Sequence, residues 1–195
     1  MMRAAAGYIT GWLIRHSAIT EEDRSLYEYA ICSLILTISP LIIVITGGCI
    51  MALVKESILF ILPFMVIRKY SGGLHLKHAW ACLLSSCIVL CLCIYVTARI
   101  PCNGIVSLLM LAAVISLGIF SPVDSENRQL DSQEKKKYKK ITIWIAMAFF
   151  AIYVLLLLLR LDYYAKWIAA GLILPAVSQI PVALKRISGK YRERN

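Results

Sequence analysis

The chain has 195 residues, of which 60% are apolar and only 16% charged, far from the balance of an ordinary soluble domain. Its formal net charge is +10 at pH 7. Because the basic residues gather between apolar segments, we attribute this charge to membrane topology and expect no nucleic-acid partner. The composition predicts an all-α polytopic membrane protein with one membrane domain over residues 1–195.

Residues 1–18 are the first predicted element, a helix that lies in the headgroup plane. Tyr8, Trp12 and other apolar side chains are interspersed with Arg3 and Arg15, a pattern too weakly apolar for a span but suited to the membrane surface. We expect no signal peptide, because the apolar region is short and broken and no small-residue cleavage site follows it.

Two polar residues mark the start of the next helix. Thr20 is followed three residues later by Asp23, a spacing typical of a helix N-terminus.

About six transmembrane helices follow, in a predicted bundle over residues 31–184. Most of the apolar stretches approach the ~20 residues that a bilayer requires. These stretches are 31–54, 57–67, 79–98, 104–120, 141–159 and 164–184.

The first of these stretches is too long and the second too short, so the boundary between them must lie elsewhere. Glycine pairs favour turns, and Gly47–Gly48 therefore predicts spans over 31–46 and 50–67, with Lys55 and Glu56 inside or near the outer end of the second. The alternative is that 57–67 forms a re-entrant half-helix, which is tolerated only where protein or a wet cavity shelters it.

The basic residues predict the orientation. If the N-terminus is cytoplasmic and the chain crosses six times, seventeen of the 21 Lys and Arg residues fall on the inner side, a strong positive-inside bias. Both termini, the basic tail over 185–195 and the segment 68–78 are then cytoplasmic.

One of the seven cysteines differs from the others. Cys82 falls in the first turn of the 79–98 helix, where the helix N-terminus and the nearby Lys77 and Arg68 would favour a thiolate. The other six lie in or beside apolar stretches, where a thiol behaves as a small hydrophobe; they are Cys32, Cys49, Cys87, Cys91, Cys93 and Cys102.

Three interpretations of His75, His78 and Cys82 compete. The histidines can sit in a solvated basic loop while the cysteine packs, or all three can form a metal-ligand set on one helix face. Alternatively, His75 can deprotonate Cys82 as the base of a cysteine nucleophile. A straight helix would separate residues seven apart by ~10.5 Å along its axis, so the catalytic pair requires the chain to fold back at Gly72 and Gly73.

A lysine-rich run begins the fifth span. Asp131 and Glu134, three residues apart, predict a helix cap immediately before it. The run is explained by topology, since each basic residue near an anionic leaflet contributes ~1 kcal/mol, but it can also dock an acidic peptide. Its members are Lys135, Lys136, Lys137, Lys139 and Lys140.

The pattern Arg68-x4-Gly73-x-His75-x6-Cys82, between the second and third apolar spans, resembles the accessory gene regulator B family. Members of this family are membrane endopeptidases that process autoinducing peptide precursors in Gram-positive quorum sensing. The resemblance extends over nearly the whole chain and includes the segments 20–23, 27–29 and 121–128. One departure is Gln129, which stands where the family pattern leads us to expect proline.

The resemblance implies a cysteine peptidase with Cys82 as nucleophile and His75 as general base, and with no cofactor or metal. It would cleave a short propeptide on the C-terminal side of the signal segment through an acyl-enzyme thioester, and it would then close the product to a thiolactone or lactone. By the same resemblance, Gly72 and Gly73 shape the loop, and Arg68 binds an acidic substrate group or favours the thiolate.

The resemblance also implies the partners. We expect a propeptide with an amphipathic N-terminal helix and an acidic C-terminal tail that docks on the lysine run, the lipid bilayer of a bacterial cell membrane, and a second copy of the chain in a homodimer. Asp124, Glu126 and Asn127 are candidates to orient His75, with no firm role assigned.

A small transporter or membrane scaffold is the competing hypothesis from another class. In that case the glycine-containing loop would line a substrate path. Transporters are expected to carry polar groups or broken helices near the midplane, and the sequence offers little of this apart from Lys55, Glu56, Pro63 and Pro175.

Overall fold

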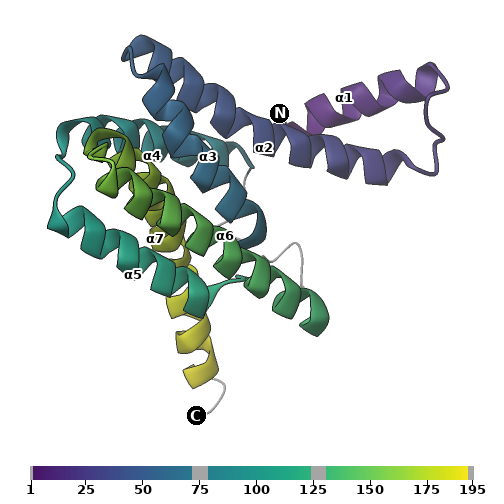
Figure 1. The fold of residues 1–195 in the computed structure, drawn as a ribbon. Coiled ribbons are helices and arrows are strands. Elements are labelled where there is room, and N and C mark those ends of the chain that lie inside the picture. Colours follow the sequence, from purple (N-terminus) through teal and green to yellow (C-terminus); the bar gives the residue numbers. More distant parts are fainter. Residues whose placement is uncertain (1, 72–78, 124–130, 193–195) are drawn as a thin grey trace. The chain divides into compact units, whose positions relative to one another are not determined.

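The computed structural model describes residues 2–71, 79–123 and 131–192, and these ranges contain helices and no strand (Figure 1). The predicted all-α class is therefore confirmed. The helices in the described ranges are α1 (Met2–Arg15), α2 (Arg24–Ile50), α3 (Val54–Ser71), α4 (Ala79–Arg99), α5 (Gly104–Phe120), α6 (Ser132–Leu158) and α7 (Asp162–Arg192).

Two of the described helices are long and apolar enough to cross a bilayer. They are α2, over Arg24–Ile50, and the part of α6 over Gln133–Leu158, each longer than the ~20 residues that a crossing needs. Shorter apolar helices cover Leu84–Arg99 and Gly104–Phe120. The described helices thus support two of the six predicted crossings, and the other four stay a prediction.

The prediction that Gly47–Gly48 ends the first long helix is wrong. α2 continues through both glycines to Ile50. The chain turns after Ile50, and Ala52 has a positive φ of 55°. Leu53 N–H donates to the Gly48 carbonyl at 2.7 Å and Ala52 N–H to the Cys49 carbonyl at 3.2 Å, which is the hydrogen-bond pattern of a Schellman helix end.

Gly48 allows a close approach of two helices rather than a turn. A Cβ at this position would clash with the Ser57 hydroxyl and would lie 2.8 Å from the Ser57 Cβ. Ser57 is fully buried in the first turn of α3. A glycine in a helix is therefore required here by a neighbour nine positions away, and α3 begins at Val54.

The chain divides into two compact units. The first comprises Met1–Gly47 and Leu76–Leu92, and the second comprises Gly48–His75 and Cys93–Asn195. The predicted single membrane domain over 1–195 stays a prediction. α7 continues to Arg192, so the predicted tail over 185–195 is helical as far as that residue, and its separation from the bundle stays a prediction.

In the first unit, α1 covers Met2–Arg15, so the prediction of a helix near the N-terminus is confirmed. Ala6 and Thr10 are buried, and the Thr10 hydroxyl donates to the Ala6 carbonyl at 2.9 Å. By contrast, Tyr8 is 72% and Trp12 50% exposed. Exposed aromatic side chains on one helix are suited to a membrane surface, and the interfacial placement stays a prediction.

The start of α2 is close to the predicted position. Asp23, rather than Thr20, directly precedes the helix, and its carbonyl accepts the first helical bond from Tyr27 N–H at 3.0 Å. The Thr20 hydroxyl donates to the Asp23 carboxylate at 2.8 Å. The Thr20–Asp23 pair therefore forms a turn that leads into the helix.

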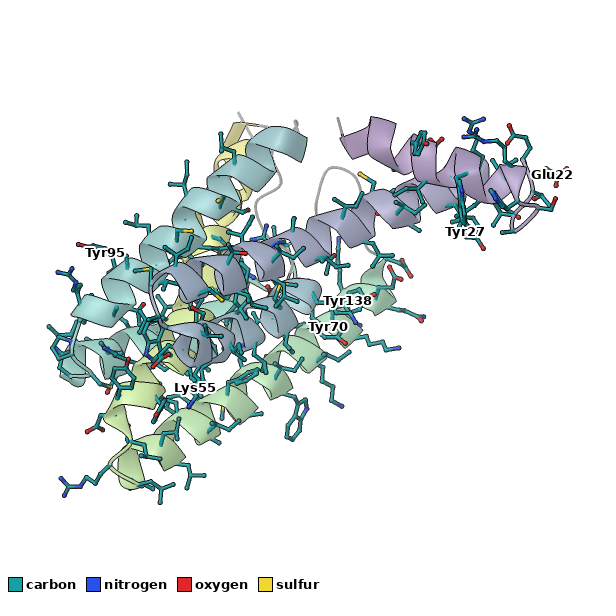
Figure 2. All side chains as sticks on the ribbon, turned by 90° about the horizontal axis from the view of Figure 1, so that it is seen from above. Glu22, Tyr27, Lys55, Tyr70, Tyr95 and Tyr138 are labelled. Atoms are coloured by element: carbon teal, nitrogen blue, oxygen red, sulfur yellow. The ribbon has the colours of Figure 1, made fainter. Side chains whose placement is uncertain are left out.

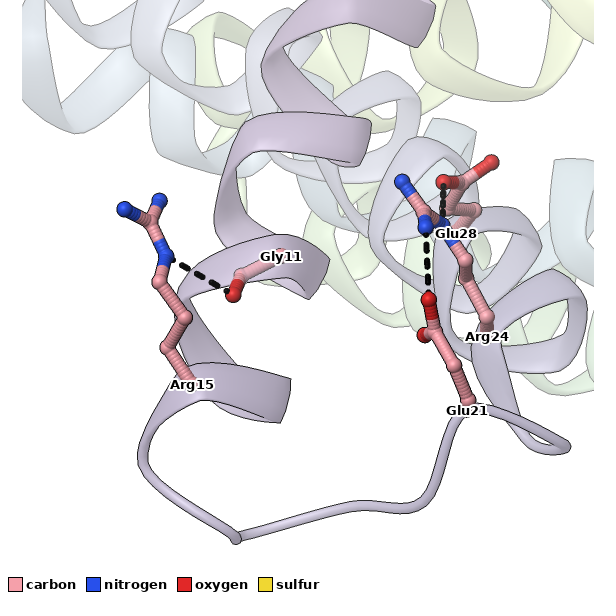
Figure 3. A network of polar contacts seen from close by, with 5 residues as sticks. All are labelled: Gly11, Arg15, Glu21, Arg24 and Glu28. Atoms are coloured by element: carbon pink, nitrogen blue, oxygen red, sulfur yellow. Dashed lines mark hydrogen bonds and ion pairs between the residues drawn. The ribbon is translucent and has the colours of Figure 1, made fainter.

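Arg24, the first residue of α2, forms two ion pairs at this end of the first unit. Its guanidinium lies 2.9 Å from the Glu21 carboxylate and 3.2 Å from the Glu28 carboxylate (Figure 3). Because the side chains are exposed, we expect these pairs to contribute little to stability.

In the second unit, α3, α5, α6 and α7 share one apolar core. α3 and α7 approach closely at Gly171, where a Cβ would clash with the Phe60 carbonyl oxygen and would lie 2.5 Å from the Pro63 Cγ. The core includes Ile67, Met110, Leu117, Tyr153, Ile168 and Leu172. This packing fixes the end of α3 that precedes Gly72.

A buried lysine joins α7 to the end of α4. Lys166 is 7% exposed, and its ammonium donates to the Ile100 carbonyl at 3.0 Å and to the Ala98 carbonyl at 3.4 Å. The last carbonyls of a helix lack intrahelical donors and carry partial negative charge. The end of α4 thereby compensates the buried charge.

Candidate active site

The predicted nucleophile lies at the start of a helix. α4 begins at Ala79, which places Cys82 in its first turn, as the sequence predicted. The unpaired peptide N–H groups and the dipole at a helix N-terminus stabilise a negative charge nearby. A cysteine at such a position is suited to react as a thiolate.

The partners predicted for Cys82 lie outside the described residues. These are Gly72, Gly73, His75 and His78, together with Asp124, Glu126 and Asn127. The His75–Cys82 pair and the alternative metal-ligand set therefore both stay predictions. Within the described ranges, no group of three or more His, Cys, Asp or Glu residues could hold a metal ion.

Arg68, one of the predicted supporting residues, lies in the last turn of α3. Its guanidinium carbon is 5.5 Å from the centre of the Phe64 ring, within the range of a cation–π contact. The Arg68 side chain is half-buried, and Phe64 is buried. The contact holds a positive charge three residues before the end of the helix.

Three donors converge on the carbonyl oxygen of Ser71, the last residue of α3. Val123 N–H donates to it at 2.9 Å, the Gln179 side-chain amide at 3.2 Å and the Ser121 hydroxyl at 3.5 Å. The same amide of Gln179 also donates to the Ser121 hydroxyl oxygen at 3.2 Å. Ser71, Ser121 and Gln179 are all buried, so this polar cluster is sheltered from solvent.

No pattern in the sequence indicated this cluster. Gln179 lies in the apolar stretch 164–184, and polar residues inside such stretches are costly and often functional. That signal could have singled out Gln179, but it could not have indicated Ser71 as its partner, because the two residues are 108 positions apart.

The lysine-rich run lies on α6, as predicted. The Asp131 backbone N–H donates to the Glu134 carboxylate at 3.4 Å, and α6 begins at Ser132, so the predicted cap is confirmed. We name the run the basic helix face. Lys135 is half-buried, and the exposed members are Lys136, Lys137, Lys139 and Lys140.

The basic helix face begins beside the end of α3. Tyr70 of α3 and Tyr138 of α6 have ring centres 6.0 Å apart (Figure 2). The Lys69 ammonium lies 5.5 Å from the centre of the Tyr70 ring. Positive residues therefore extend from α6 to Lys69 in the last turn of α3, three positions before Gly72.

Six of the seven cysteines in the described ranges, all except Cys82, are free thiols, as expected for residues of apolar helices. Cys49 is exposed, and the others are half-buried: Cys32, Cys87, Cys91, Cys93 and Cys102. Disulfide bonds therefore play no part in holding together the described helices.

Long apolar helices with positive charge at their ends define a class, that of helical membrane-associated proteins. A model of the accessory gene regulator B family matches residues 6–180 of the chain. The chain therefore belongs to the accessory gene regulator B family, which confirms the resemblance drawn from its sequence. Membership implies a part in the processing of quorum-sensing peptides.

Curated relatives agree with this assignment. An AgrB-like protein 2 of Clostridium perfringens is 26% identical over 159 residues, which cover 75% of this chain and 72% of the relative. An AgrB-like protein of Listeria innocua is 23% identical over 88% of this chain and 84% of its own length. Accessory gene regulator protein B of Staphylococcus carnosus is 26% identical over 62% of each chain. No solved structure matches significantly.

Proposed function

We propose that the chain is a membrane-embedded cysteine endopeptidase that cleaves a quorum-sensing propeptide and closes the product into a ring. The observation that carries this proposal is the position of Cys82 in the first turn of α4, in a chain of the accessory gene regulator B family. A thiol at a helix N-terminus is favoured as a thiolate.

In the first step, His75 takes the proton of the Cys82 thiol, and the thiolate attacks the carbonyl carbon of the scissile peptide bond. The C–N bond then breaks. The C-terminal fragment leaves with its new amine, which receives the proton from His75. The N-terminal part of the propeptide remains bound to Cys82 as a thioester.

In the second step, a thiol or hydroxyl of the bound propeptide attacks the thioester carbonyl and gives its proton to His75. The Cys82 thiolate leaves and is reprotonated, and the peptide becomes a thiolactone or lactone. A thioester keeps its acyl group available for exchange with another thiol, provided that water is kept away.

The supporting residues have distinct roles in this proposal. Gly72 and Gly73 allow the chain to fold back so that His75 reaches Cys82, because glycine adopts backbone conformations closed to other residues. The Arg68 guanidinium, anchored over the Phe64 ring, binds an acidic group of the propeptide or favours the Cys82 thiolate.

The membrane placement forms part of the same proposal. A multi-pass chain with both termini in the cytoplasm puts Cys82 and the basic helix face on the side where an unprocessed propeptide arrives. The positive-inside bias supports this orientation.

The proposal is tested by trapping the thioester with hydroxylamine. Purified protein is reconstituted in lipid vesicles with a candidate precursor peptide, and hydroxylamine is added during turnover. Its nitrogen attacks the thioester and releases the Cys82 thiol, so we expect the hydroxamate of the N-terminal fragment by mass spectrometry. Because a thiolactone product would give the same hydroxamate, protein quenched with acid before hydroxylamine is added should also show an acyl adduct on Cys82. Release of the C-terminal fragment without any hydroxamate would contradict the acyl-enzyme.

The basic helix face is proposed to dock the acidic tail of the propeptide. Glutamine at Lys136, Lys137, Lys139 and Lys140 is expected to raise KM about tenfold at low salt and to leave kcat within about twofold, because long-range attraction steers association rather than the chemical step. Peptide cleavage is followed at low and high ionic strength, and high salt should remove most of the difference.

The matched control changes exposed basic residues at other helix ends. Glutamine at four other exposed basic residues, Arg15, Lys55, Arg99 and Arg160, removes the same number of positive charges, and KM should not change. An equal rise in KM for both variants would show that net charge matters, and the basic helix face would then have no docking role.

A further inference from the structure

Gln179 is a fully buried polar residue of the second unit. It lies on α7, its side chain is 0% exposed, and its amide nitrogen lies 3.2 Å from both the Ser71 carbonyl oxygen and the Ser121 hydroxyl oxygen. A carbonyl oxygen only accepts hydrogen bonds. The nitrogen of the Gln179 amide must therefore face Ser71, which fixes the orientation of the side chain.

The Ser71 carbonyl does not require Gln179 in order to be satisfied. As one of the last four carbonyls of α3, it lacks an intrahelical donor, but Val123 N–H already donates to it at 2.9 Å. The Gln179 amide adds a second, longer bond, and the Ser121 hydroxyl a third. The carbonyl thus accepts two hydrogen bonds beyond the one that satisfies it, and these additional bonds restrain its direction.

Packing does not explain why a polar side chain stands at position 179 either. Its side-chain oxygen is buried and has no hydrogen-bond partner among the described residues. A half-satisfied polar side chain is less stable in an apolar interior than a hydrophobic residue of similar volume. Such an exception in a native structure calls for an explanation.

The position of Ser71 in the chain supplies an explanation for the buried Gln179 side chain. Ser71 is the last residue of α3, directly before Gly72 and Gly73 and four positions before His75. The direction of the Ser71 carbonyl fixes the plane of the peptide group that joins Ser71 to Gly72, because that group is planar. Gln179 therefore acts on the point where the chain leaves α3.

We propose that Gln179 is a positioning residue for His75, the proposed general base, acting from α7 through the Ser71 carbonyl and the Ser121 hydroxyl. This inference rests on the proposed cysteine-peptidase function. Gln179 touches no reacting atom. It fixes the exit of the chain from α3, and thereby the start of the segment that carries the general base.

The test compares Gln179→Leu with Thr142→Val. Gln179→Leu keeps the side-chain volume and removes the amide, whereas Thr142 is an equally buried polar residue of the same unit that has no side-chain partner among the described residues. We expect Gln179→Leu to lower kcat about 100-fold with little change in KM, since a displacement of about 1 Å at a catalytic group has that effect. Thr142→Val should leave both constants unchanged.

A second measurement reports on His75 and Cys82 in the absence of substrate. The rate of Cys82 alkylation by iodoacetamide is measured against pH by mass spectrometry of the Cys82 peptide. If His75 is displaced, the midpoint of the profile should move upward by about one pH unit, because the thiolate loses the neighbouring protonated imidazole that stabilises it. A merely structural role would lower the yield of folded protein and leave this midpoint in place.

The outcomes separate this inference from the function on which it rests. An inactive Cys82→Ala with a Gln179→Leu that retains the wild-type kcat and alkylation profile would overturn the positioning role alone. An active Cys82→Ala would overturn the peptidase itself. If Gln179→Leu does not fold, Gln179→Met keeps the length of the side chain and removes the donor. Ser121→Ala removes the second member of the cluster, and normal constants in both variants would overturn the inference.

Discussion

Cys82→Ala is expected to abolish release of the C-terminal fragment from a precursor peptide, with a fall in kcat of roughly 10,000-fold or more. The substitution removes the nucleophile, so neither the thioester nor the ring can form. Fragment and ring are quantified by mass spectrometry with protein reconstituted in vesicles. His75→Ala should lower kcat about 1,000-fold, the scale of a general base.

Cys87→Ala is the matched control for the nucleophile. Cys87 is a free, half-buried thiol on the same helix, α4, so its loss tests whether any thiol of this helix supports turnover. We expect activity within about twofold of wild type, as for a small change away from the reacting atoms. Normal cleavage by both Cys82→Ala and His75→Ala would refute the cysteine-peptidase function.

Local signals in the sequence predicted the helix ends that depend on neighbouring residues. Asp131 and Glu134 lie three positions apart, and the cap that they form before α6 is visible in the sequence itself. The turn from Thr20 to Asp23 was found in the same way, although the cap is Asp23. Such contacts are read from spacing because both partners lie within one helical turn.

The failure at Gly47–Gly48 has a non-local cause. A glycine pair predicts a turn only if conformational freedom is the reason for the glycines. Here Gly48 is required by the hydroxyl of Ser57, and the actual turn uses Ala52 in a left-handed conformation. Nothing in the local pattern distinguishes a glycine that turns the chain from one that lets another helix approach.

The candidate site likewise contains a residue that the sequence indicated and a cluster that it did not. The family pattern identified Cys82 and its place in the first turn of α4, which follows from the start of an apolar stretch. The Ser71–Ser121–Gln179 cluster joins three segments that are 50 to 108 positions apart. Such a cluster exists only once α3 and α7 have packed, so spacing in the sequence carries no sign of it.

The packing of α3 against α7 yields the second large expected effect. Gly171→Ala is expected to lower the free energy of unfolding by about 3 kcal/mol, the upper range for overpacking a well-filled interior. The added Cβ would clash with the Phe60 carbonyl oxygen and lie 2.5 Å from the Pro63 Cγ. Because the first contact is to backbone, no side-chain rotation relieves it, and α3 must shift as a whole.

Gly118→Ala serves as the control for Gly171→Ala. A Cβ at Gly118, on α5, would meet only the Ile143 Cγ1 at 4.0 Å, an ordinary contact, and alanine favours a helix over glycine by about 1 kcal/mol. Unfolding in mixed micelles, followed by tryptophan fluorescence, should therefore show Gly118→Ala at or above wild-type stability. Because α3 carries Arg68 and ends at Ser71, a shifted α3 should also lower kcat in Gly171→Ala protein that remains folded. Wild-type stability of Gly171→Ala would show that α3 and α7 do not pack at this glycine.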